Sequence, residues 1–196
     1  MKKIKIKKLI GCLLIILGAA VIISSILFNI YQQIQRKNLI EEYRQTVTAE
    51  DSQSATNDAS QDKNTNLVCI VRIPKIDSEN PVVEGTSSSS LSAALGHESS
   101  TALPGETGNC VIAGHRNYTF GQYFNRLSEI EEGDMIYVDT DNTTYSYKVS
   151  SISVVEPTDL SVLEQSTDKK LLTLYTCTPI YVATHRLVIT AELETE

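Results

Sequence analysis

One uninterrupted apolar stretch near the start restricts where this chain can reside. Residues 9–28 (LIGCLLIILGAAVIISSILF) are twenty consecutive residues without a charged side chain. A helix rises about 1.5 Å per residue, so this stretch spans roughly 30 Å, the thickness of the hydrocarbon core of a bilayer. The stretch therefore predicts a transmembrane helix, with the rest of the chain outside the bilayer.

A cleaved signal peptide is the alternative interpretation of this start, because both kinds of segment follow basic residues. The apolar part of a signal peptide is usually about 7–15 residues long, and this one is longer. No small-x-small cleavage site follows it, so we favour an uncleaved anchor. Residues 1–8 contain five lysines. The positive-inside rule then predicts a cytoplasmic tail at 1–8 and an extracellular location for everything after the helix.

The charge of the remaining chain argues against nucleic acid as a partner. Of 17 basic residues, five precede the apolar stretch, which leaves 12 basic against 24 acidic residues after it. Phosphate binding needs clustered Lys and Arg, and no such cluster is present there. The sequence also lacks Cys-x-x-Cys pairs, His-x-x-x-His helices and a glycine-rich phosphate loop. We therefore expect neither a metal site nor a nucleotide site.

Three segments follow the predicted anchor at 9–28. Residues 29–45 have a helical pattern and form a stalk, whereas 46–66 are rich in Ser, Thr, Asn, Asp and Gln. Such a polar segment buries too little apolar surface to offset its chain entropy, so 29–66 is expected to be stalk and flexible linker. The folded domain is expected at 67–196.

This domain is a succession of short β-type runs with brief helical segments. Strands are expected at 67–73, 81–84, 109–114, 135–138, 145–155, 170–176 and 186–193, and helical turns at 91–95, 120–127 and 157–163. The strand runs are enriched in apolar and β-branched residues and bounded by turn residues. About eight strands with short helices predict an all-β fold, a closed or nearly closed β-barrel.

Among the cysteines and histidines of the domain, two stand out. Cys69 and Cys110 lie inside apolar runs, where a free cysteine behaves as a small buried hydrophobe. Cys177 instead follows the run LLTLYT and shortly precedes Pro179. Proline cannot continue a central strand, so we expect an exposed thiol where the chain turns. His115 follows the run VIAG in the same way, and side chains at the strand ends of one barrel can converge on one rim.

Arg186 opens the next apolar run after Cys177 and can return to the same rim. Only a thiolate attacks, so a nearby imidazolium from His115 helps, and the same ring can protonate a departing amine. A guanidinium stays charged and suits a developing oxyanion. Spacing alone leaves a non-catalytic alternative open, in which His115 is a surface loop residue and Arg186 makes a surface ion pair.

Several segments, in this order, resemble those of the sortases, a family of cysteine transpeptidases. The segment LLTLYTCTP matches the family pattern TLxTC, whose last residue is the nucleophile, here Cys177. GNCVIAGHR is similar to the strand that ends in the catalytic histidine, here His115, and THRLVI contains the family's arginine, Arg186. The stretch ALGHESSTALPG resembles the block upstream of that histidine. Together these segments cover most of residues 67–193.

The resemblance implies an eight-stranded sortase β-barrel and a two-step transpeptidation. Cys177 would attack the Thr carbonyl of an LPxTG-like sorting signal, His115 would protonate the leaving amine, and Arg186 would hold the oxyanion. Thr176 is expected to help position the substrate. The implied partners are surface proteins with a C-terminal LPxTG-like signal, and an amine on a peptidoglycan precursor or a pilin. This chemistry requires no cofactor, although some family members bind calcium.

Two other histidines are weighed against His115. His97 matches a family position that is not catalytic, and we expect it to be structural. His185 adjoins Arg186, and on a strand the two side chains face opposite ways. His115 is therefore the favoured acid/base, and His185 remains the alternative.

The subclass of the family stays open. Pilin-polymerising members usually carry an Asp-Pro-aromatic lid motif before the barrel, and residues 46–66 contain no proline. This favours a lid-free enzyme, similar to the housekeeping or class D types, that attaches proteins to the cell wall. The segment TCTPIYVATHRL also resembles pilin-type members, which keeps a pilin lysine as an alternative acceptor. Two further alternatives are another cysteine acyltransferase or protease with the same trio, and an anchored β-domain that binds wall or host components without catalysis.

Overall fold

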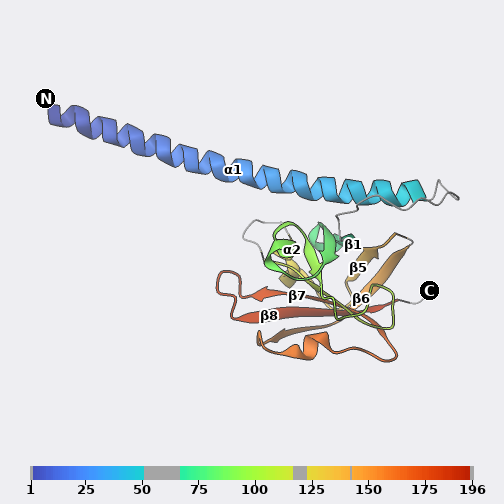
Figure 1. Cartoon of the computed structure of the whole chain (residues 1–196). Helices are drawn as coiled ribbons and strands as arrows, with labels where there is room; N and C mark the ends of the chain where they lie inside the picture. The colour runs from blue at the N-terminus through green and yellow to red at the C-terminus, as the bar shows by residue number, and fades with distance from the viewer. Residues whose placement is uncertain (1, 51–66, 117–122, 142, 195–196) are drawn as a thin grey trace. The chain divides into compact units, whose positions relative to one another are not determined.

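The computed structural model describes residues 2–50, 67–116, 123–141 and 143–194. Helix α1 (Lys2–Glu50) is one continuous helix, and the chain divides into two units, Met1–Asn38 and Leu39–Glu196 (Figure 1). Within α1, Ile10–Glu41 is long and apolar enough to cross a membrane. Large apolar side chains from Ile10 to Ile34 are exposed, as expected for a helix that lies in lipid, whereas Ile40 near the end of this stretch is buried. The helix continues into the residues expected to form the stalk and the start of the linker, and 51–66 lie outside the described residues.

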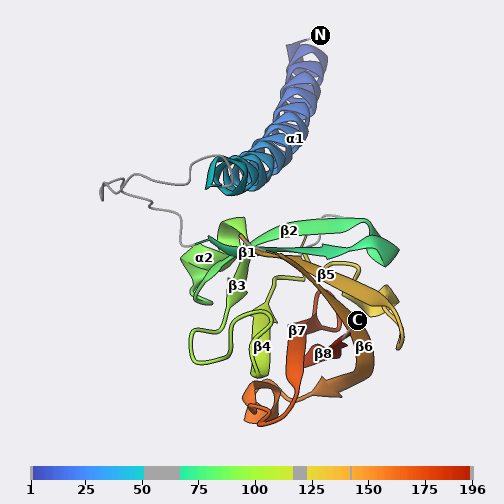
Figure 2. The same ribbon diagram turned by 90° about the vertical axis from the view of Figure 1, so that its right-hand side faces the viewer.

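Eight strands close into a barrel in the second unit, which confirms the predicted fold class (Figure 2). Their order around the barrel is β1-β2-β3-β4-β7-β8-β6-β5, and among the described strands only β2–β3 and β4–β7 pair in parallel. The strands are β1 (Leu67–Ile73), β2 (Ser78–Glu84), β3 (Leu95–His97), β4 (Gly108–Ala113), β5 (Met135–Asp139), β6 (Thr144–Val155), β7 (Lys170–Thr178) and β8 (His185–Leu193). The short helices are η1 (Pro74–Ile76), α2 (Ser88–Ala93), η2 (Leu127–Glu129) and η3 (Leu160–Leu163).

Alternation along the strands separates a barrel interior from an outer face. On β7, Leu172 and Leu174 are fully buried in the core, and side chains two residues apart on a strand share a face. Tyr175 and Cys177 therefore face outward. The same alternation on β4 sends Cys110 into the core. The position of a residue along its strand, odd or even, thus decides whether its side chain faces the core or the outer face.

Two expectations about helices are corrected. The helix expected at 91–95 is α2, which begins at Ser88, because the hydroxyl of Ser87 accepts a hydrogen bond from the Ser90 amide and caps it. It ends at Ala93, and Leu95 already belongs to β3.

The helical turns expected at 120–127 are partly outside the described residues. Those described there form turns and the 3-10 helix η2, and Tyr123 has a left-handed backbone with φ of 48° that ends any regular helix. All of the expected strands are present. β2 begins three residues earlier than predicted, and β7 extends two residues further.

Candidate active site

Parallel pairing of β4 with β7 brings the His115 and Cys177 segments together. Ala113 is the register partner of Tyr175, and the Gly114 amide donates to the Tyr175 carbonyl at 3.1 Å. Advancing two residues on both strands sets His115 beside Cys177. His115 is exposed and Cys177 is half-buried, so both side chains are open to a bound molecule.

Antiparallel pairing of β7 with β8 adds Arg186 to this pair. Cys177 and Arg186 are direct register partners, and side chains directly opposite one another have Cβ atoms about 4.5–5.5 Å apart. The Arg186 Nη1 donates to the His185 carbonyl at 3.1 Å, which ties down one end of the guanidinium. His115, just beyond β4, therefore forms one row with Cys177 of β7 and Arg186 of β8, which we call the candidate row.

A groove with a volume of about 390 Å³ runs over this row on the outer face of the barrel. One wall is the β6–β7 connection with η3, drawn in orange in Figure 2. Asn109 of β4 fastens this connection, because its Nδ2 donates to the carbonyls of Val162 and Glu164, each at 3.1 Å. The groove is lined by Thr86, Leu91, Glu98, Ala113, Gly114, His115, Val155, Pro157, Asp159, Leu160, Val162, Leu163, Tyr175, Thr176, Cys177 and Arg186. The lining combines apolar side chains with the polar groups Glu98, Asp159 and Arg186.

Side-chain hydrogen bonds hold the candidate row where the regular strand β4 has ended. Thr176, 1% exposed, donates from Oγ1 to the Gly114 carbonyl at 2.7 Å, one residue before His115. One residue beyond it, Arg116 Nη1 donates to Thr178 Oγ1 at 2.7 Å. The two bonds bracket His115 and Cys177 on both sides. The hydroxyl of Thr176 is therefore engaged within the protein.

The other cysteines lie inside the barrel and have different chemistry. Cys69 and Cys110 are buried in the core, as predicted. Burial raises the pKa of the Cys110 thiol from its usual 9.0 to about 12, and it raises the pKa of Cys69 well above the usual value. Both therefore stay protonated and unreactive near neutral pH.

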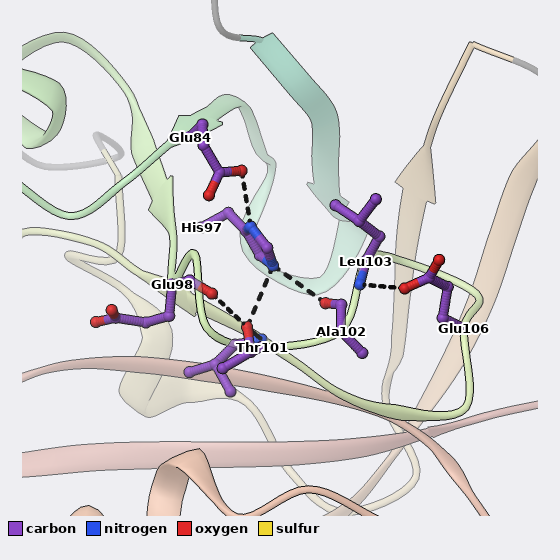
Figure 3. Close-up of polar contacts among 8 residues, drawn as sticks. Glu84, His97, Glu98, Thr101, Ala102, Leu103 and Glu106 are labelled. Carbon is purple, nitrogen blue, oxygen red and sulfur yellow. Dashed lines mark hydrogen bonds and ion pairs between the residues drawn. The ribbon is translucent and has the colours of Figure 1, made fainter.

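His97 is a buried side chain with partners on both ring nitrogens (Figure 3). It is 2% exposed, with Nδ1 at 2.9 Å from Glu84 Oε2 and Nε2 at 3.1 Å from the Ala102 carbonyl. Burial raises the pKa of Glu84, but hydrogen bonds from Ser99 and His97 outweigh it, and the pKa is lowered. The ring fastens β3 to the turn that follows, which is a structural role.

His185 adjoins the groove-lining Arg186 but does not itself line the groove. It is the register partner of Thr178, and its Nε2 lies 3.2 Å from Glu156 Oε1. On a strand the side chains of His185 and Arg186 face opposite ways, and of these two residues Arg186 alone lines the groove.

Sequence reasoning missed two polar residues of the groove, Tyr175 and Glu98. The Tyr175 hydroxyl donates to Glu98 Oε1 at 2.6 Å. Tyr175 precedes Cys177 by two residues, so strand alternation alone indicates that both share a face. Glu98 gives no comparable signal, because it reaches the groove only through the pairing of β3 with β4 and of β4 with β7. Among the described residues, no group of three or more His, Cys, Asp or Glu side chains is arranged to hold a metal ion.

Comparison with known proteins connects this geometry to one family. The sortase domain model matches residues 71–194. Sortase D of Bacillus subtilis is 34% identical over 110 residues, which cover 56% of this chain and 54% of that protein. Sortase SrtE1 of Streptomyces coelicolor is 35% identical over 142 residues, which cover 65% of this chain and 40% of that protein. The chain thus matches about half the length of these relatives or less.

A solved structure gives the corresponding likeness in three dimensions. Sortase C of Streptococcus pneumoniae, described with respect to catalysis and pilin substrate specificity, superposes with a TM-score of 0.68 at 25% identity. The superposition covers 81% of this chain and 97% of that one. The β-barrel is therefore shared over almost the whole of the related domain.

Proposed function

The chain belongs to the sortase family, and on that premise we propose that it is a cysteine transpeptidase that cleaves an LPxTG-like sorting signal and transfers the protein to an amine. One observation carries the proposal. His115, Cys177 and Arg186 occupy one row on the floor of a groove, which is the set of groups that acyl transfer through a thiol needs.

In the first half-reaction the Cys177 thiolate attacks the Thr carbonyl carbon of the sorting signal. The S–C bond forms, and the carbonyl electrons move onto oxygen, where the Arg186 guanidinium donates hydrogen bonds to the oxyanion. As the tetrahedral intermediate collapses, the C–N bond breaks and His115 gives its proton to the leaving amine. The products are a thioacyl enzyme and the released C-terminal peptide.

In the second half-reaction an acceptor amine attacks the thioester. His115, now neutral, takes the proton from the amine, and Cys177 leaves as a thiolate. The enzyme returns to its starting state with no cofactor consumed. Thr176 supports both steps indirectly, because its bond to the Gly114 carbonyl holds the backbone that carries His115.

The acceptor has two candidate classes. We propose a cell-wall amine on a peptidoglycan precursor, because residues 46–66 contain no proline with which to build a lid motif. A pilin lysine is the second candidate, favoured by the likeness to the Streptococcus pneumoniae enzyme described in terms of pilin substrates. The apolar helix of α1 would anchor the enzyme in the cell membrane, with the lysines before it in the cytoplasm and the barrel outside.

A trapping experiment tests the function. The full-length chain in detergent micelles is mixed with LPxTG-like peptides, quenched in acid and digested, and Cys177 is examined by mass spectrometry. We expect the mass of the acyl part of the peptide on Cys177, and its loss when an amine acceptor is added, with a new amide product. Adducts that hydrolyse equally fast with and without an acceptor would identify a protease instead. No adduct with any LPxTG-like peptide would contradict the proposal.

The same experiment separates the two acceptor classes. A short peptide with a free N-terminal amine mimics a wall cross-bridge, whereas a peptide with a blocked N-terminus and one internal lysine mimics a pilin. A product from the first and none from the second supports the cell-wall assignment. The reverse result would replace it with pilin polymerisation.

A further inference from the structure

Glu98 lies in the groove at a position fixed by its backbone. Its amide donates to the Val111 carbonyl at 2.9 Å, and its carbonyl accepts from the Thr101 amide at 2.8 Å and from the Thr101 Oγ1 at 2.7 Å. The neighbouring His97 ring fastens the same turn, and Figure 3 shows the Glu98 side chain directed away from that ring. The carboxylate therefore projects from a rigid turn.

Tyr175 holds this carboxylate on the groove floor. Its hydroxyl donates to Glu98 Oε1 at 2.6 Å, and burial, followed by this hydrogen bond, raises the pKa of Tyr175. The phenol thus remains a donor, which suits the Glu98 carboxyl oxygen as its acceptor. Among the described residues no Lys, Arg or His side chain forms an ion pair with Glu98, whereas the neighbouring Glu84 pairs with His97. A half-buried carboxylate in this groove is stabilised when a ligand brings a positive charge.

The place of Glu98 argues against the amine that attacks the thioester as the source of this positive charge. β4 lies between β3 and β7, so the strand that leads to Glu98 and the strand of Cys177 are roughly 10 Å apart. Along β4, its partner Val111 precedes His115 by four residues, about 13 Å. These are backbone separations, and the Glu98 carboxylate itself reaches toward β7, where it accepts from Tyr175, two residues before Cys177. A charge bound at Glu98 is still offset from Cys177 along the groove, so we assign it to another part of the chain that fills the groove.

We infer that Glu98 and Tyr175 form a cation subsite that selects sorting signals with a lysine or arginine side chain on the acyl side of the scissile bond. The inference rests on the proposed transpeptidase function and adds a specificity to it. The basic side chain of a bound signal then meets the Glu98 carboxylate, while Arg186 meets the oxyanion that forms at the scissile carbonyl.

Peptide selectivity tests the subsite. LPxTG-like peptides with lysine placed in turn at each position before the scissile Thr are compared with matched peptides containing norleucine or glutamate there. The full-length enzyme in micelles is expected to show about tenfold higher kcat/KM for lysine at one position. Glu98→Gln should remove the preference, and Glu98→Lys should shift it to glutamate.

Glu106→Gln is the matched control. Glu106 lies at the far end of the same loop, accepts a hydrogen bond from the Leu103 amide and does not line the groove (Figure 3). This variant should keep the lysine preference of the native enzyme, and raising the salt concentration should weaken that preference.

Two results would overturn the inference while the proposed function stands. One is equal kcat/KM for lysine and norleucine peptides at every position, with normal thioacyl formation on Cys177. The other is a Glu98→Gln variant that slows all peptides by the same factor, which indicates a structural role. Absence of thioacyl formation with every peptide would instead defeat the proposed function, and the subsite with it.

Discussion

Cys110 and Cys177 lie on neighbouring strands, yet one faces the barrel interior and the other its outer face. Cys110 is 1% exposed with a pKa raised to about 12, whereas Cys177 lies in the groove opposite Arg186. The two thiols differ in environment and not in residue type. The barrel thus encloses one cysteine and leaves another accessible on an adjacent strand, and parity along the strand decides which is which.

The histidines repeat this contrast. The His97 ring is enclosed and bonded at both nitrogens, so its orientation is fixed and it has no site left for a substrate. The His115 ring is exposed at the end of β4, and among the described residues it has no hydrogen-bond partner. The enclosed His97 ring stabilises the fold, whereas the exposed His115 ring is available for proton transfer.

The cysteine pair gives the largest expected difference. Cys177→Ala should lower kcat for acyl transfer about 10⁴-fold or more, because no nucleophile remains, with little change in the melting temperature. Cys110→Ala should do the reverse, with near-native kcat and a loss of stability of about 1–3 kcal/mol from the cavity it leaves. Peptide turnover and thermal melts followed by circular dichroism measure both. Substantial turnover by Cys177→Ala would contradict the assignment of Cys177 as the nucleophile.

The exposed histidines give the next contrast. His115→Gln should reduce kcat about 10³-fold, because proton transfer to and from the amine loses its carrier. His185→Gln removes a ring that lies 3.2 Å from Glu156 and outside the groove, and kcat should stay within about twofold. Steady-state kinetics of both variants decides the acid/base assignment. A larger loss for His185→Gln would make His185 the acid/base.

Arg186 tests the third member of the row. Arg186→Lys keeps the positive charge but loses the forked donors, and kcat should fall about 10²-fold with a smaller effect on KM. Arg72→Lys is the control, because Arg72 pairs with Asp139 at 2.6 Å on β1, away from the groove. It should affect stability only. Equal kcat values for the two variants would remove Arg186 from the mechanism.

A smaller effect on kcat is expected from the hydrogen bond between Arg116 and Thr178, which holds the row in place. Thr178→Val removes the acceptor of the 2.7 Å bond from Arg116 and should lower kcat about fivefold, the equivalent of about 1 kcal/mol, with KM unchanged. Thr178→Ser keeps the hydroxyl and should restore kcat. If serine and valine give the same value, the bond does not position the row.

The interior thiols also predict a loss of stability in alkali. The unfolded Cys110 thiol titrates near 9.0, and the folded one only near 12, so between these values the unfolded state binds fewer protons. The free energy of unfolding should therefore be unaffected below pH 9 and fall as the pH rises, by at most about 1.4 kcal/mol per pH unit for this group. Urea unfolding between pH 8 and 11 measures the slope. Cys110→Ala should make it shallower, and an unchanged slope would mean that the buried thiol does not contribute.

Features that depend on local sequence were predictable. The twenty apolar residues at 9–28 have the length of a bilayer-spanning helix, and such length is a property of the segment alone. The apolar runs of β4 and β7 and the proline after Cys177 predicted buried strands with an exposed end. The His115, Cys177 and Arg186 positions followed from ordered motifs, although their catalytic roles remain predictions.

What only the tertiary structure decided depends on pairing between distant segments. Residues 62 positions apart, His115 and Cys177, share a row because β4 and β7 pair in parallel with Ala113 beside Tyr175, and no local pattern specifies a register between them. The same pairing brings Glu98 Oε1 within 2.6 Å of the Tyr175 hydroxyl, which places a carboxylate in the groove. The sequence by itself determined which residues can perform the chemistry, since that is a property of each side chain and its strand. The closed barrel decided which of these side chains lie close together, because residues on different strands come into contact only once the strands have paired in a defined register.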